Sequence, residues 1–110
     1  MVLKVKGLKF VQTCEISPEQ YNVLDSHDNQ VGYVRLRWGE LRCDIPDCGG
    51  KTIFANQFDD DLKGCFDSDA ERNYFLGKIA DEINRRREGF LKRIFKSLCK
   101  TFSEMKFTML

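Results

Sequence analysis

The feature that most constrains the fold is a two-residue alternation in residues 31–38 and, after a break at residues 39–40, again in residues 41–45. One series is apolar and consists of Val34, Leu36, Trp38, Leu41, Cys43 and Ile45. The other series is largely polar and consists of Tyr33, Arg35, Arg37, Arg42 and Asp44. Because side chains alternate between the two faces of a strand, the pattern predicts two half-buried strands joined at Gly39-Glu40, with the apolar series facing the core.

Shorter segments on either side predict further strands. Residues 8–14, 20–25 and 51–55 are rich in aromatic and β-branched residues. They are separated by turn-forming residues at 17–19, 26–29 and 46–50. Short connections pair strands in sequence order, so we expect an antiparallel β-meander of about five strands over residues 8–55.

After residue 69, the spacing of the apolar residues changes from that of a strand to that of a helix. Ser68 and Glu71 have the spacing of a capping box. A stripe at helical spacing follows and consists of Phe75, Leu76, Ile79, Ala80 and Ile83. The sequence therefore predicts an α+β domain over residues 1–84, in which a helix at 69–84 packs on one face of the sheet.

Residues 85–110 are predicted to form a separate basic, amphipathic helical extension. Arg87 falls in the apolar arc, and Gly89 costs a helix about 1 kcal/mol relative to Ala, so we expect a break here. A second helix is expected over residues 90–106. Its apolar arc consists of Phe90, Leu91, Ile94, Phe95, Leu98, Cys99, Phe102 and Met105, and its basic face of Lys92, Arg93, Lys96 and Lys100.

Charge divides the chain in the same place. Residues 1–84 carry ten basic and fifteen acidic groups, a net of −5, whereas residues 85–110 carry eight basic and two acidic groups, a net of +6. This asymmetry suggests either that the extension docks on its own acidic body or that it meets an anionic partner.

The sequence contains few of the residues and motifs that typically carry out catalysis. His27 is the only histidine and lies in a predicted turn. The sequence contains no glycine-rich phosphate loop and no Cys-x-x-Cys motif, and its five cysteines are interpreted as reduced thiols. We expect a protein that is not an enzyme and has no cofactor, bound metal or small-molecule substrate; a small acyltransferase-like enzyme is the least favoured alternative. The N-terminus does not resemble a signal peptide, which predicts a cytoplasmic location.

The hypothesis is therefore a non-catalytic interaction protein that binds a protein partner or a second copy of itself. The candidate contact residues are an acidic loop cluster and the basic extension: Asp59, Asp60, Asp61, Arg85, Arg86, Arg87, Phe90, Lys92, Arg93, Phe95, Lys96 and Lys100. Two alternatives stay open. Tyr33, Arg35 and Arg37, with the arginines at 85–87, could bind nucleic acid, and residues 90–107 could lie on a membrane surface.

Four short motifs resemble a family of small, mostly uncharacterised bacterial proteins found in Firmicutes and their mobile elements. They are Pro18-Glu19-Gln20-Tyr21, the stretch from Val31 to Arg37, Pro46-Asp47-Cys48-Gly49-Gly50 and Asp69-Ala70-Glu71-Arg72. The resemblance covers residues 14–84 and implies no activity. It implies a phage or mobile-element origin, a context in which proteins of this size bind and inhibit host macromolecules, including defence systems. The extension after residue 84 lies outside it.

Overall fold

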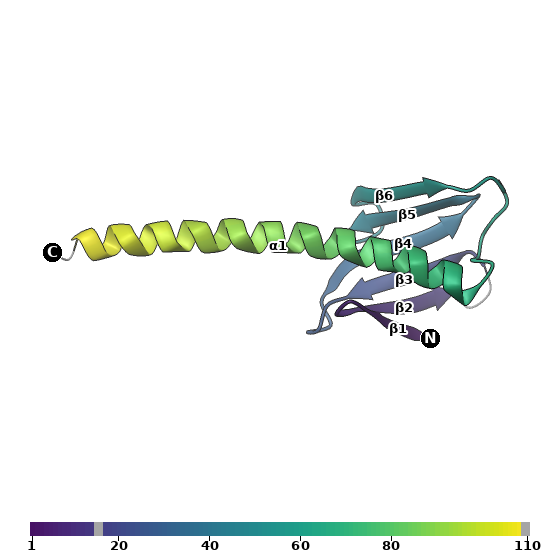
Figure 1. Ribbon diagram of the computed structural model, residues 1–110, viewed down its shortest axis with the longest axis horizontal. Coiled ribbons are helices and arrows are strands. Elements are labelled where there is room, and N and C mark those ends of the chain that lie inside the picture. The colour runs from purple at the N-terminus through teal and green to yellow at the C-terminus, as the bar shows by residue number, and fades with distance from the viewer. Residues whose placement is uncertain (15–16, 109–110) are drawn as a thin grey trace.

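One antiparallel sheet and one long helix make up the fold (Figure 1). The computed structural model describes residues 1–14 and 17–108, with side chains described up to residue 96. In this part of the chain, six strands pair in sequence order: β1 (Val2–Val5), β2 (Leu8–Cys14), β3 (Glu19–Leu24), β4 (Gln30–Arg37), β5 (Glu40–Ile45) and β6 (Lys51–Gln57). Helix α1 (Asp69–Thr108) follows. The predicted α+β meander is confirmed.

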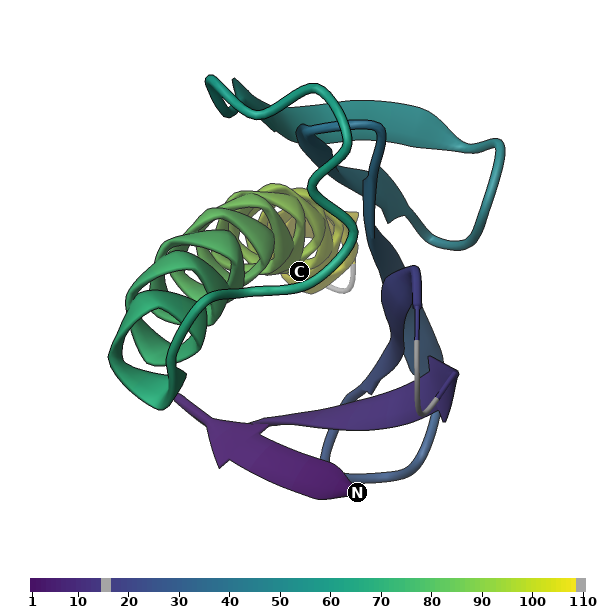
Figure 2. The same cartoon turned by 90° about the vertical axis from the view of Figure 1, so that its right-hand side faces the viewer.

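The sheet curves around the first half of α1, which lies on its concave face and contacts both edge strands, β1 and β6 (Figure 2). The alternation in β4 and β5 places Val34, Leu36, Leu41 and Cys43 on this face, as predicted. The other buried apolar residues are Leu8, Phe10, Tyr21, Val23, Phe66, Leu76, Ile79, Ala80 and Ile83. The core is thus one layer between the sheet and the N-terminal half of the helix.

Strand β1 is an addition to the five predicted strands. It pairs with β2 through a two-residue turn at Lys6-Gly7, where both residues have positive φ angles of 51° and 82°. Such turns match the twist of a hairpin. We did not predict this strand because it is short and its side chains are at most half-buried, so its apolar pattern is weak.

Trp38 departs from the predicted inward series. Strand β4 ends at Arg37, and Trp38-Gly39 forms the two-residue turn to β5 with φ angles of 54° and 74°. The Trp38 side chain is 64% exposed as a result. Gly39 is required here, because a Cβ atom at this position would lie 2.5 Å from the carbonyl oxygen of Asp60.

The predicted break at residues 85–89 and the separate second helix are wrong, because α1 is continuous from Asp69 to Thr108. Arg87 does face the sheet, but its guanidinium lies 3.4 Å from the Asp25 carboxylate, which compensates its charge. Gly89 costs only about 1 kcal/mol, which is too little to interrupt a helix that is anchored on the core. Ser68 caps the helix as predicted and accepts a hydrogen bond from the backbone N–H of Glu71 at 3.1 Å.

The C-terminal half of α1 runs past the end of the sheet (Figure 1). The molecule is consequently elongated, with principal dimensions of 66 × 24 × 23 Å. No helix in the described part of the chain is long and apolar enough to cross a membrane.

Candidate functional site

The helix face that packs on the sheet continues as an apolar face beyond the sheet. Leu76, Ile79 and Ile83 are buried against the strands. The same face then carries residues that we call the projecting stripe: Phe90, Leu91, Ile94 and Phe95, which are 58%, 61%, 41% and 70% exposed. Exposed apolar patches of this kind are a recurrent feature of interaction surfaces.

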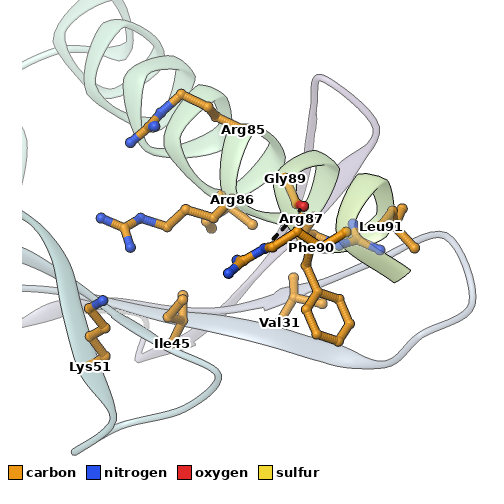
Figure 3. Close-up of a pocket in the computed structure, with 11 residues that line it drawn as sticks. Val31, Ile45, Lys51, Arg85, Arg86, Arg87, Gly89, Phe90 and Leu91 are labelled. Atoms are coloured by element: carbon orange, nitrogen blue, oxygen red, sulfur yellow. Dashed lines mark hydrogen bonds between the residues drawn. The ribbon is translucent and has the colours of Figure 1, made fainter. Parts of the chain in front are cut away.

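A groove of about 750 Å³ opens where α1 leaves the sheet, and we call it the junction groove (Figure 3). Val31 and Ile45 form its wall on the sheet side. Ile83, Phe90 and Leu91 form its wall on the helix side. Both walls are apolar, and the projecting stripe enters the groove through Phe90 and Leu91.

Basic side chains surround these walls. They are Lys51 at the start of β6 and Arg85, Arg86, Arg87 and Arg93 from the helix. Among the described residues, none that lines the groove carries a carboxylate. The rim is therefore rich in basic groups and the walls are apolar, a combination that suits a ligand with both a negative charge and an apolar surface.

The cations of the rim differ in how far they are neutralised. Arg85 and Arg86 pair with Glu82 at 2.5 and 3.0 Å, which lowers the pKa of that carboxyl. Among the described side chains, Lys51 and Arg93 have no carboxylate within ion-pair distance. These two side chains are exposed and available to an anionic ligand.

Asp25 fixes the position of Arg87 at this groove. Its carboxylate accepts hydrogen bonds from the backbone N–H groups of His27 and Asn29, both at 2.9 Å. The bond from Asn29 is the main reason that the pKa of Asp25 lies below its usual value; burial opposes the shift, and His27 and Arg87 support it. The ionised carboxylate holds Arg87, and so the helix, against the loop between β3 and β4.

The predicted acidic cluster lies far from the predicted basic residues. Asp59, Asp60 and Asp61 are in the exposed loop after β6, at the end of the molecule where α1 begins (Figure 1). The Asp60 carboxylate accepts a hydrogen bond from the backbone N–H of Leu62 at 2.9 Å, so it shapes its own loop. The structure does not bring the two candidate surfaces together.

Tyr33, Arg35 and Arg37 share the outer face of β4, as the alternation predicted. Arg35 is the register partner of Arg42 on β5, and Arg42 lies within 4 Å of both Glu40 and Asp44. Those carboxylates neutralise part of the charge of this face. The guanidinium of Arg37 lies 5.8 Å from the ring centre of Trp38, which completes a small cation–aromatic surface.

Some of the remaining predicted contact residues line the junction groove, and others lie outside it. Phe90 and Arg93 line the junction groove, whereas Lys92 and Lys96 are exposed and lie outside its lining. The side chain of Lys100 lies outside the described residues. No local pattern marks Val31, Ile45 or Lys51 as site residues, because these residues at strand ends reach the site only when the end of the sheet meets the helix.

The cysteines do not form a metal site in the described part of the chain. No group of three or more potential ligands is found there. Cys43 is in the core, where burial raises the pKa of its thiol to about 12, so it stays protonated. Cys48 and Cys65 are exposed on different loops.

Comparisons of the chain with protein-family models, with curated protein sequences and with solved structures found no match.

Proposed function

We propose that the chain is a non-catalytic binding protein that contacts a protein partner through the projecting stripe. The observation that carries the proposal is the exposure of four large apolar side chains on one helix face, from 41% at Ile94 to 70% at Phe95. Burying a fully exposed side chain of this size contributes about 1.5–3 kcal/mol, and these partly covered side chains would each contribute roughly half of that. Together, the four can offset the several kcal/mol that association costs.

The way in which the stripe is presented also supports this function. The N-terminal half of α1 is anchored in the core, and the same continuous helix carries the stripe away from the sheet. A helix whose direction is already fixed loses less conformational freedom on binding than a disordered segment. The fold thus acts as a base for a partly preorganised contact surface.

An inhibitory role toward a host macromolecule is the most specific form of this proposal. It rests on the resemblance of residues 14–84 to proteins of phage and mobile-element context. It predicts that the partner comes from a bacterial host and that its activity decreases when it is bound.

Nucleic-acid binding by the outer face of β4 is the second candidate function. The observation that favours it is Trp38, which is 64% exposed beside Arg37. Exposed aromatic rings next to arginines stack on the bases of single strands. This function requires an affinity that falls steeply with salt, and a single-stranded oligonucleotide that shows no binding at low salt would exclude it.

The test of the main proposal compares two double variants of the full chain. Phe90→Ser with Phe95→Ser removes half of the projecting stripe, and Val2→Ser with Leu62→Ser removes comparably exposed apolar side chains elsewhere on the molecule. Each variant is used as bait in host extract, with retained proteins quantified by mass spectrometry, and is examined by sedimentation velocity for self-association.

We expect a specific protein, or a second copy, to be retained by the wild type and by the Val2/Leu62 variant. The Phe90/Phe95 variant should retain at least about tenfold less, since burial of the two anchors accounts for about 1.5–3 kcal/mol. If all three forms retain the same proteins and show the same assembly state, the projecting stripe is not the contact surface.

A further inference from the structure

We infer that the junction groove is a docking site for an acidic amphipathic helix of the partner protein. The inference rests on the proposed function and deepens it by naming the chemistry of the partner. Its occupant would place apolar side chains between the two walls of the groove and carboxylates against the basic rim. This corresponds to helix-in-groove recognition, in which affinity comes from apolar anchors at helical spacing.

The charge of the groove determines the sign of the occupant. Of the described residues that line the groove, five are basic and none is acidic, but Arg85, Arg86 and Arg87 already pair with Glu82 or Asp25. Lys51 lies on the sheet side and Arg93 on the helix side, and neither has a carboxylate partner among the described residues. A basic or neutral occupant would leave these charges uncompensated as water is displaced, whereas an acidic occupant would pair with them.

The shape of the groove favours an elongated, apolar-faced element. The Phe90 ring of the helix points toward Val31 of the sheet, and Ile45 continues the sheet wall away from Phe90 (Figure 3). The groove continues outward into the projecting stripe, where Ile94 and Phe95 follow on the same helix. A helix lying along α1 would therefore cover the groove and the stripe in one contact.

Two other occupants fit the structure less well. A second copy would bring its own projecting stripe, which is accompanied by Lys92, Arg93 and Lys96, so like charges would meet at the rim. A flat membrane surface would reach the groove only past the end of the sheet, because Val31 and Ile45 form one of the groove's walls.

The test measures binding of a fluorescent helical peptide, made of leucine at i, i+3, i+4 and i+7 spacing and glutamate elsewhere, by fluorescence anisotropy. The groove variant is Lys51→Glu with Arg93→Glu. The matched control is Lys92→Glu with Lys96→Glu, which changes the net charge equally but lies outside the groove lining. All four positions are exposed, and urea unfolding of each variant checks that the fold is retained.

We expect the full chain to bind this peptide and the groove variant to bind it at least about tenfold more weakly, since two favourable charge contacts become repulsive. The affinity of the Lys92/Lys96 control for the peptide should fall by no more than about threefold. A peptide of the same composition in scrambled order should bind weakly to the full chain. Equal loss in both variants would show attraction to overall charge and overturn the inference.

Two further outcomes would also overturn it. One is tighter binding of phosphatidylglycerol vesicles or of a single-stranded oligonucleotide than of the peptide, with the same dependence on Lys51 and Arg93. The other is absence of peptide binding to the full chain. If the Phe90/Phe95 variant still loses its partner in that case, the proposed function stands and only the chemistry assigned to the partner is wrong.

Discussion

At the residue scale, the carboxylate of Glu19 connects strand β3 to the start of helix α1. Its buried carboxylate accepts hydrogen bonds from the hydroxyl of Tyr21, from Nε of Arg72 at 2.8 Å and from the backbone N–H of Phe66 at 3.2 Å. Burial by itself would raise the pKa of Glu19, but these hydrogen bonds outweigh it and the pKa lies below its ordinary value. This ionised group therefore ties β3 to the first turn of α1.

We expect Glu19→Gln to lower the free energy of unfolding at neutral pH by about 2–3 kcal/mol, because Arg72 loses a buried charged partner while keeping Asp69. The wild type should lose stability as the pH falls below the ordinary value of 4.5, since the unfolded state then binds more protons. The variant should lose less over the same range. Urea unfolding at several pH values measures both effects.

Asp81→Asn provides the control for this prediction. Asp81 pairs with Lys6 at 2.7 Å, but both side chains are at least half exposed. Such surface pairs contribute less than about 1 kcal/mol. A loss for Asp81→Asn as large as that for Glu19→Gln would show that burial is not what makes the Glu19 cluster stabilising.

At the scale of the element, α1 is one helix with two environments. Its first half is stabilised by packing on the sheet, whereas the segment beyond Arg87 depends on intrinsic propensity and on local side-chain pairs. The helix contains a glycine in each environment, Gly77 and Gly89, and an added Cβ atom would meet no atom within 4 Å at either position. The two glycines therefore test the two halves separately.

We expect Gly77→Ala to raise the free energy of unfolding by about 0.5–1 kcal/mol, because alanine lowers the backbone entropy lost in a helix that forms with the core. Gly89→Ala should leave the unfolding free energy nearly unchanged but increase the helical signal in far-ultraviolet circular dichroism. If both substitutions raise the free energy of unfolding equally, the segment of α1 beyond Arg87 unfolds cooperatively with the core.

At the scale of the whole molecule, acidic and basic residues gather at opposite ends of the sheet. The loop with Asp59, Asp60 and Asp61 lies at the end where α1 begins, and the junction groove lies where α1 leaves the sheet. The basic helix is thus directed away from the acidic loop of its own domain. Of the two interpretations of the charge asymmetry, this arrangement favours an external anionic partner.

Truncation after Glu88 should remove the part of α1 that carries the projecting stripe without destabilising the domain. The stripe residues are exposed, so their loss should change the free energy of unfolding by less than about 0.5 kcal/mol. The hydrodynamic radius should decrease, as measured by sedimentation velocity. A clear loss of stability would mean that the removed segment packs back on the domain in solution.

The sequence by itself determined the elements whose signals are local. The alternation of Val34 and Leu36 with Arg35 and Arg37 specified a strand and its two faces, and Ser68 with the stripe at Leu76, Ile79 and Ile83 specified the start and inner face of the helix. These patterns reflect the repeat of a strand or a helix, and such a repeat is visible in any short stretch of chain.

Only the tertiary structure decided the continuity of the helix and the composition of the groove. Arg87 looked like an interruption because its partner, Asp25, is 62 residues away in the sequence. Val31, Ile45 and Lys51 belong to three strands and meet the helix only at the end of the folded sheet. Contacts of this kind depend on how distant segments pack, and local periodicity contains no information about them.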